Sequence, residues 1–329
     1  VIMTNTYLDK SYAYAVARLR NAELKLLDKN FLDQLISAKT AEDAARQLRD
    51  RGWGSGEEGE SYEDMLNTET DKMWEYIDEL VPDLNVFNVF RYRKDYCNIK
   101  AAIKESKLDH DYPGIYSELG SVPSETVRAA IRGRNYKLLP AEMAEVAEKA
   151  HEVFLKTGDG QICDVMSDKA SLDAIRQAGR ESGDAFIQEF SELEVAASDI
   201  KIAVRAHHTG KGREFLELAM ADSGILSESA LINASLSGDD AIYSFLANTD
   251  FAGGVDALKK STAAFERWCD NMIIDRMQKM HYDAFGAGPI AAYIIARLIE
   301  IKSVGVILFG KQNGFSDSAI RERVRDTYV

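Results

Sequence analysis

Residues 98–106 read NIKAAIKES, residues 199–207 read DIKIAVRAH, and residues 300–308 read EIKSVGVIL. The first residues of successive segments are 101 positions apart in both intervals. Two positions after the first lysine of each segment, the residue is small or apolar: Ala102, Ala203 and Val304. An Ile-Lys pair alone is weak evidence, because another stands at 103–104. The joint pattern at a fixed spacing favours an internal repeat over coincidence.

A serine followed by an acidic residue comes after each copy of the repeat. The three pairs are Ser124-Glu125, Ser227-Glu228 and Ser316-Asp317. A serine hydroxyl accepts a hydrogen bond from an unpaired amide at a helix start, and an acid in the first turn interacts favourably with the helix dipole. We therefore predict that each pair opens a helix, with the serine as N-cap. Thr40, followed three residues later by Asp43, predicts another helix start.

The spacing of the repeat divides the chain into three modules. The third copy has few residues after it, so we expect the N-terminal part of the chain to complete that module. The predicted modules are residues 84–184, residues 185–285, and residues 286–329 together with residues 1–83. Such an arrangement would close the three modules into a ring.

The composition predicts an all-α protein. Of the 329 residues, 46% are hydrophobic and 29% are charged, which is typical of a globular chain. Only five residues are proline, and apolar residues recur at steps of three and four, as in Val16 and Leu19. No run of several residues alternates cleanly between apolar and polar. The segment 304–309 has strand-like residues, but it continues a helical pattern and is predicted to be helix.

The charges exclude some functions and suggest others. The formal net charge is −14, which disfavours nucleic-acid binding. Residues 57–83 contain eleven acids and one base, Lys72, and form either a solvated acidic helix face or a docking face for a basic partner. The most basic neighbourhood is the segment 91–107, which is either a solvated face or a protein-docking face.

Signatures of catalysis, cofactor binding and metal binding are missing from the sequence. The nearest match to a phosphate-binding loop, 254–261, has Lys259 where the second glycine is needed. There is no HExxH, CxxC or GxSxG motif. We therefore predict no catalytic, cofactor-binding or metal-binding residue, and three reduced cysteines.

The sequence also predicts neither a signal peptide nor a membrane span. The most apolar stretch, 289–310, is interrupted by Arg297, Glu300 and Lys302, and three charges would be costly in hydrocarbon.

Four segments of the chain resemble one protein family. They are YAYAVARLRNAELKLL (12–27), KNFLDQLISAKTAEDAARQL (29–48), NVFRYRKDYCNIKAAIK (88–104) and GPIAAYIIARLIEIKSVGVILFGKQNGFSDSAIRERVRDTYV (288–329). These segments look like the C subunit of prokaryotic V-type (A-type) ATPases, whose eukaryotic counterpart is the d subunit of the vacuolar proton pump. The resemblance covers nearly the whole chain in order, and the C-terminal segment is its most specific part. Residues 57–83 and 158–183 match less closely.

The resemblance implies a fold and a role. Members of the family are all-helical and funnel-like, with three similar modules, and have no active site or cofactor of their own. Such a protein is a socket that receives the D and F subunits of the central shaft, sits on the membrane rotor ring, and transmits torque. The resemblance therefore implies a cytoplasmic protein held at the membrane through the ATPase complex, without a transmembrane segment and without nucleic-acid partners.

The charge pattern nominates docking residues for such partners: Arg91, Arg93, Lys104, Arg321 and Arg325. Two other interpretations remain open. The chain would be a stand-alone helical-repeat scaffold if it bound no rotor ring. It would be a helical enzyme using scattered carboxylates if a deep pocket held strongly shifted titratable groups.

Overall fold

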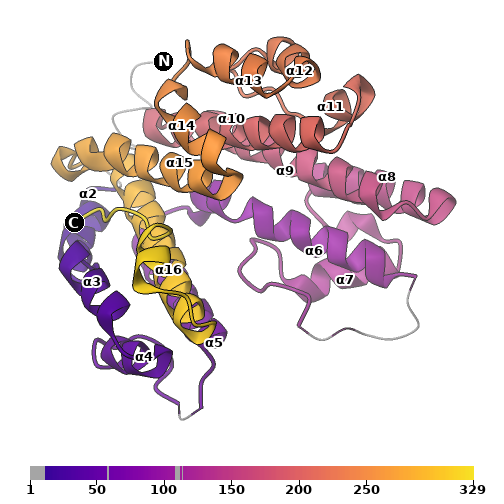
Figure 1. The fold of residues 1–329 in the computed structure, drawn as a ribbon. Helices are drawn as coiled ribbons and strands as arrows, with labels where there is room; N and C mark the ends of the chain where they lie inside the picture. The colour runs from indigo at the N-terminus through magenta and orange to yellow at the C-terminus, as the bar shows by residue number, and fades with distance from the viewer. Residues whose placement is uncertain (1–11, 58, 108–111, 113) are drawn as a thin grey trace. The chain divides into compact units, whose positions relative to one another are not determined.

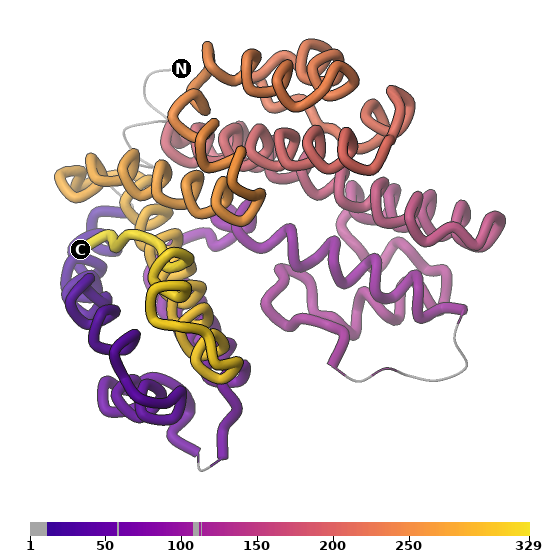
Figure 2. The backbone as a smooth tube through the Cα atoms, in the orientation of Figure 1, coloured from indigo at the N-terminus to yellow at the C-terminus, as the bar shows by residue number. Residues whose placement is uncertain are grey.

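The computed structural model describes residues 12–329, except 58, 108–111 and 113. Its regular structure is helical, and the described residues contain no strand (Figures 1 and 2). The predicted all-α fold is therefore confirmed. The chain forms two compact units. Unit 1 combines the chain up to Leu84 with Gly254–Val329, and unit 2 is Asn85–Gly253. The three predicted modules and their boundaries stay a prediction.

Unit 1 is built from the two ends of the chain. Its helices are α2 (Ala13–Glu23), α3 (Lys29–Ser37), α4 (Ala41–Arg49), α5 (Tyr62–Leu80), α14 (Val255–Lys260), α15 (Thr262–Met277), α16 (Gly288–Gln312) and α17 (Asp317–Arg321). A 3₁₀ segment, Gln278–Tyr282, follows α15. α16 contacts α2, α3, α4 and α5, so residues from the C-terminal part of the chain fill the core of the N-terminal part (Figure 1).

The burial of α16 follows from its sequence. Its residues are apolar on nearly every side, which is typical of a helix enclosed by others. Leu35, Leu48, Val304 and Ile307 are each fully buried in one core cluster. Pro289 occupies the first turn of α16, where its missing amide proton costs no hydrogen bond. The segment 304–309 is helix, as predicted.

The helix starts agree with the sequence in three of the four predicted places. Thr40, Ser227 and Ser316 each precede a helix and accept a hydrogen bond from the backbone amide three residues later. Ser124 is different, because α7 already includes it and Pro123 precedes the helix. The carboxylate of Glu118 accepts a hydrogen bond from the Ser124 amide at 3.4 Å and another from its hydroxyl. The prediction of Ser124 as an N-cap is wrong, because Pro123 occupies the N-cap position and Ser124 is the first residue of the helix.

Unit 2 is a continuous stretch of the chain. Its helices are α6 (Tyr92–Glu105), α7 (Ser124–Arg132), α8 (Ala141–Thr157), α9 (Gly160–Glu181), α10 (Ala185–His208), α11 (Arg213–Ala219), α12 (Glu228–Ser237) and α13 (Asp239–Leu246). Shorter 3₁₀ segments are Leu84–Phe90, Tyr136–Leu138 and Ala252–Gly254. α9 packs against α6, α8 and α10 and is the central helix of this unit.

The residues that open the three repeat copies share a structural role. Asn98 on α6 accepts a hydrogen bond from the Ser117 amide at 2.9 Å, and Asp199 on α10 accepts one from the Ala221 amide at 3.1 Å. Glu300 on α16 accepts one from the Leu27 amide. All three side chains are buried. Each therefore ties a long helix to the backbone of another segment.

The longest helices do not have the character of membrane spans. Within the described ranges, no helix combines the length and the apolar character needed to cross a bilayer.

Candidate interaction surfaces

Three predicted docking residues lie in unit 2 and contact its own side chains. The Arg93 guanidinium donates to Glu194 at 2.6 Å and to the Ser198 hydroxyl at 2.7 Å. Lys104 forms an ion pair with Asp164 at 2.6 Å. Arg91 donates to the Gly120 carbonyl. The side chains of Arg93 and Lys104 are each 45% exposed, so both remain accessible.

The lysine face of α6 is neutralised inside unit 2. Lys100 pairs with Asp168 at 2.5 Å, so two acids of α9 face two lysines of α6. Lys107 lies 4.4 Å from the centre of the Phe154 ring and donates to the Phe154 carbonyl at 2.7 Å. The basic segment 91–107 therefore holds helices together in addition to presenting charge to solvent.

The other two predicted docking residues line one hollow in unit 1. Arg321 lies 3.1 Å from Asp33 on α3 and is 48% exposed. The Arg325 side chain is only 8% exposed, and its Nε lies 2.8 Å from Asp270 on α15. The hollow has a volume of about 640 Å³ and is also lined by Lys29. The structure thus brings Arg321 and Arg325 together, with Arg325 buried in the wall.

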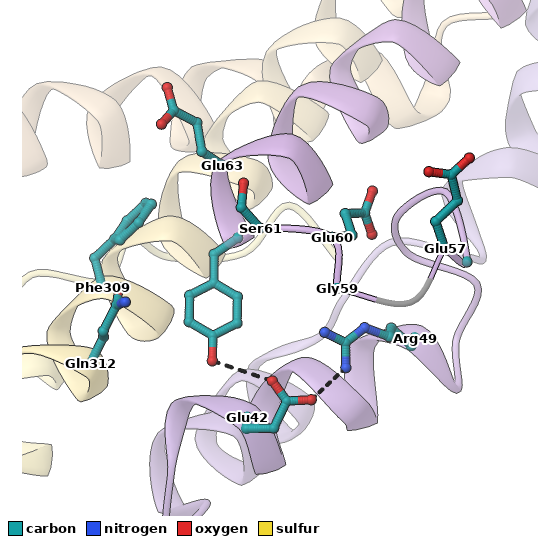
Figure 3. A pocket seen from close by; sticks show the side chains of 11 residues that line it. Glu42, Arg49, Glu57, Gly59, Glu60, Ser61, Glu63, Phe309 and Gln312 are labelled. Carbon is teal, nitrogen blue, oxygen red and sulfur yellow. Dashed lines mark hydrogen bonds and ion pairs between the residues drawn. The ribbon is translucent and has the colours of Figure 1, made fainter.

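A second hollow in unit 1, which we call the acidic hollow, contains part of the predicted acidic stretch. It has a volume of about 650 Å³ and is lined by α4, the loop before α5, the start of α5, and α16. Its acidic residues are Glu42, Glu57, Glu60 and Glu63 (Figure 3). Arg49 is the one basic residue in its described lining and forms an ion pair with Glu42 at 2.6 Å.

The electrostatics of the acidic hollow favour the ionised form of Glu42. The hydrogen bond from Arg49 holds the pKa of Glu42 below its usual value. Phe309, whose exposed fraction is 40%, borders the hollow on α16. The surface therefore combines four carboxylates with an exposed aromatic ring, which suits a basic or amphipathic segment.

A buried charge cluster in unit 1 was not predicted from the sequence. Arg297 on α16 lies 2.7 Å from Glu69 on α5 and also pairs with Glu300, three residues along α16. Its guanidinium lies 5.1 Å from the centre of the Trp53 ring. Burial raises the pKa of the Glu300 carboxyl, while Arg297 and the Leu27 amide act in the opposite direction.

The contact between Arg297 and Glu300 could have been predicted from the sequence. The spacing of Arg297 and Glu300 places both on one helix face, where opposite charges pair. No local pattern points to Glu69, which is separated from Arg297 by 228 positions. Within the described residues, no group of three or more His, Cys, Asp or Glu side chains is arranged to hold a metal ion.

Comparisons with known proteins identify relatives over almost the full chain. A family model described as ATP synthase (C/AC39) subunit matches residues 15–323. The C subunit of the V-type sodium ATPase of Enterococcus hirae is 21% identical over 320 residues, covering 94% of this chain and 97% of that protein. The C subunit of the A-type ATP synthase of Methanocaldococcus jannaschii is 24% identical over 347 residues, covering 94% and 85%. The same-named protein of Methanothermobacter thermautotrophicus is 23% identical, covering 94% and 87%. With the family model spanning nearly all of its residues, this all-helical chain belongs to the ATP synthase (C/AC39) subunit family.

Proposed function

We propose that this chain is a non-catalytic central-stalk component of a rotary V/A-type ATPase. It acts as a socket that links the D–F shaft to the membrane rotor ring and transmits torque during ion transport. The observation that carries this proposal is the family match over residues 15–323. The protein is then held at the cytoplasmic face of the membrane by the complex.

The packing of the units supports a mechanical role. Close-packed interiors resist deformation, and a torque-transmitting part must not yield under load. In unit 1, α16 is buried among α2, α3, α4 and α5, and the Glu69–Arg297–Glu300 cluster ties α5 to α16. In unit 2, ion pairs tie α6 to α9. Each unit is therefore stiffened by contacts between distant segments.

The exposed charges are the proposed docking groups. The acidic hollow suits a basic segment of a partner, and Arg93, Lys104 and Arg321 suit an acidic one, because each is nearly half exposed. Arg91 and Arg325 act at these surfaces mainly by holding backbone and side chains in place. Polar contacts of this kind select partners by complementary charge.

The first test is co-purification of the tagged chain with the D–F shaft, followed by the purified rotor ring. We expect one complex that contains all of them. A chain that is folded but is retained by neither the shaft nor the ring would contradict the proposal and favour a stand-alone scaffold.

A charge-reversal variant tests the acidic hollow. Glu57→Lys combined with Glu63→Lys should weaken the complex about tenfold or more, since like charges would then face a basic partner. Asp256→Lys is the matched control, because Asp256 is exposed and does not line the acidic hollow. Equal retention of the shaft and the ring by all three proteins would remove the acidic hollow from the docking surface.

A further inference from the structure

A third hollow in unit 1, which we call the basic hollow, has the opposite charge. Its volume is about 510 Å³, within the range of roughly 300–1,000 Å³ that is common for small-molecule sites. It is lined by α2, the turn after α4, α5 and α16, which are neighbours in unit 1 (Figure 1). Its basic residues are Arg18, Lys25, Arg51, Lys72 and Arg297. Its aromatic residues are Trp53, Tyr76 and Tyr293.

Two of the five cations are partly neutralised within the wall. Glu69 is the single acidic residue of the described lining. It lies 2.7 Å from Lys72 and 2.7 Å from Arg297, so one carboxylate is shared by two cations. Glu300, which is not among the lining residues, also forms an ion pair with Arg297. The inner part of the hollow therefore carries little uncompensated charge.

The other three cations form no ion pair within the described lining. Arg18, Lys25 and Arg51 are exposed. In the part of the chain that the structure describes, no carboxylate forms an ion pair with any of them. Arg18 donates to the Tyr14 hydroxyl at 2.8 Å, and the Arg51 guanidinium lies 3.7 Å from the centre of the Phe31 ring. A protein with a net charge of −14 thus gathers three uncompensated cations around one hollow.

Two side chains in the wall of the basic hollow are held in place by contacts within unit 1. Lys72 donates to the carbonyls of Gly52 and Gly54 at 2.9 Å and 2.7 Å. The Tyr76 hydroxyl donates to the Arg18 carbonyl at 3.1 Å, which ties α5 to α2. These contacts fix the wall of the hollow, and the exposed cations Arg18, Lys25 and Arg51 are left to contact a ligand.

We propose that the basic hollow binds a small phosphorylated anion. Two guanidinium groups and an ammonium group that have no carboxylate partner among the described residues match the several oxygens and the multiple charge of a phosphate or diphosphate. A single carboxylate would compensate only one of the three cations. The volume accommodates either inorganic diphosphate or a nucleotide, and both present the same phosphate chemistry. The site lies within unit 1 and does not depend on the proposed shaft and ring contacts.

The test is calorimetric titration of the purified full chain at low salt with inorganic diphosphate and, separately, with ADP. Both should bind at one site per chain. Lys25→Gln and Arg51→Gln should each weaken binding about three- to tenfold, as expected for a charge-assisted contact at a partly exposed site. Lys39→Gln is the matched control, since Lys39 is an exposed lysine of unit 1 that does not line the hollow. Circular dichroism confirms that each variant is folded.

The outcomes distinguish recognition of phosphate alone from recognition of a nucleotide, and both from binding of an acidic peptide. Equal affinity for diphosphate and ADP supports recognition of phosphate alone, and tighter binding of ADP supports a nucleotide. Absence of binding at millimolar concentrations overturns the proposal, and so does an equal loss in Lys39→Gln. Binding of a poly-glutamate peptide without binding of diphosphate would also overturn it, by assigning the hollow to an acidic protein segment.

Discussion

At residue 199, an aspartate occupies the repeat position that Asn98 holds on α6. Its Oδ1 accepts a hydrogen bond from the Ala221 amide at 3.1 Å, and the side chain is 3% exposed. Burial raises the pKa of Asp199 to about 8, against the opposing effect of the Ala221 amide. The charges of Glu228 and Asp173 raise the pKa further, and that of Lys169 lowers it. The native protein therefore keeps a proton on Asp199 at neutral pH.

This pKa predicts how Asp199→Asn changes stability with pH. The native pKa lies above the unfolded value, so the Asp199 contribution is fully present below about pH 4 and is lost as pH rises toward 8. Asparagine keeps the acceptor and does not ionise. At pH 8.5 the variant should be several kcal/mol more stable than the parent, and at pH 6 the difference should be about half as large. Urea unfolding followed by circular dichroism measures both values. An unchanged pH dependence would show that Asp199 does not titrate as described.

The buried Arg297 predicts a large effect of a single substitution. Arg297→Met leaves Glu300 buried without its cation, while Glu69 keeps Lys72, so we expect a loss of about 3–5 kcal/mol in unfolding free energy. Arg93→Met removes an exposed ion pair and should cost less than about 1 kcal/mol. The three tryptophans, Trp53, Trp74 and Trp268, all lie in unit 1, so their fluorescence reports the unfolding of the unit that contains Arg297. Circular dichroism measures the unfolding of Arg93→Met. Equal losses in the two variants would mean that the cluster contributes little.

At the scale of elements, the contact between α9 and α10 depends on a glycine. Gly179 lies inside α9, and a Cβ placed there would overlap the side chain of Ser191 on α10. Gly179→Ala should therefore destabilise unit 2 by about 1–3 kcal/mol, even though alanine favours helix. Gly160→Ala on the same helix is the control, because its Cβ would meet neighbours no closer than 3.7 Å. Thermal unfolding compares them. A gain in stability for Gly179→Ala would show that α9 and α10 can move apart without loss of unfolding free energy.

The helices themselves follow from local sequence, and their partners do not. The periodicity of residues 289–310 predicts α16, and Thr40, Ser227 and Ser316 predict caps, because these signals depend on a few neighbouring residues. Ser124 fails as a cap because α7 begins one residue earlier than predicted, so that Ser124 lies inside the first turn and Glu118 accepts a hydrogen bond from its amide. Contacts such as Glu69–Arg297 depend on packing between distant segments. The charges of the docking surfaces were visible in the sequence, but the hollows that gather them come from the fold.

At the scale of the whole molecule, the repeat and the compact units describe the chain differently. The sequence predicts three modules, and the structure groups the chain into two units, with the first and last segments together in unit 1. Asn98, Asp199 and Glu300, which open the three repeat copies, each accept a hydrogen bond from a backbone amide of another segment. Superposition of α6, α10 and α16 with the segments that they bind is the direct comparison for the three-module prediction.

Unit 1 also has a consequence for the order in which the chain folds on the ribosome. Unit 2 is continuous, so all of its helices have emerged before translation reaches α16. The amide of Leu27 hydrogen-bonds to Glu300, which is translated 273 residues later. The apolar faces of α2 to α5 that pack on α16 therefore stay uncovered until α16 has been made. Nascent chains should therefore be more prone to aggregation before α16 is made than after release from the ribosome.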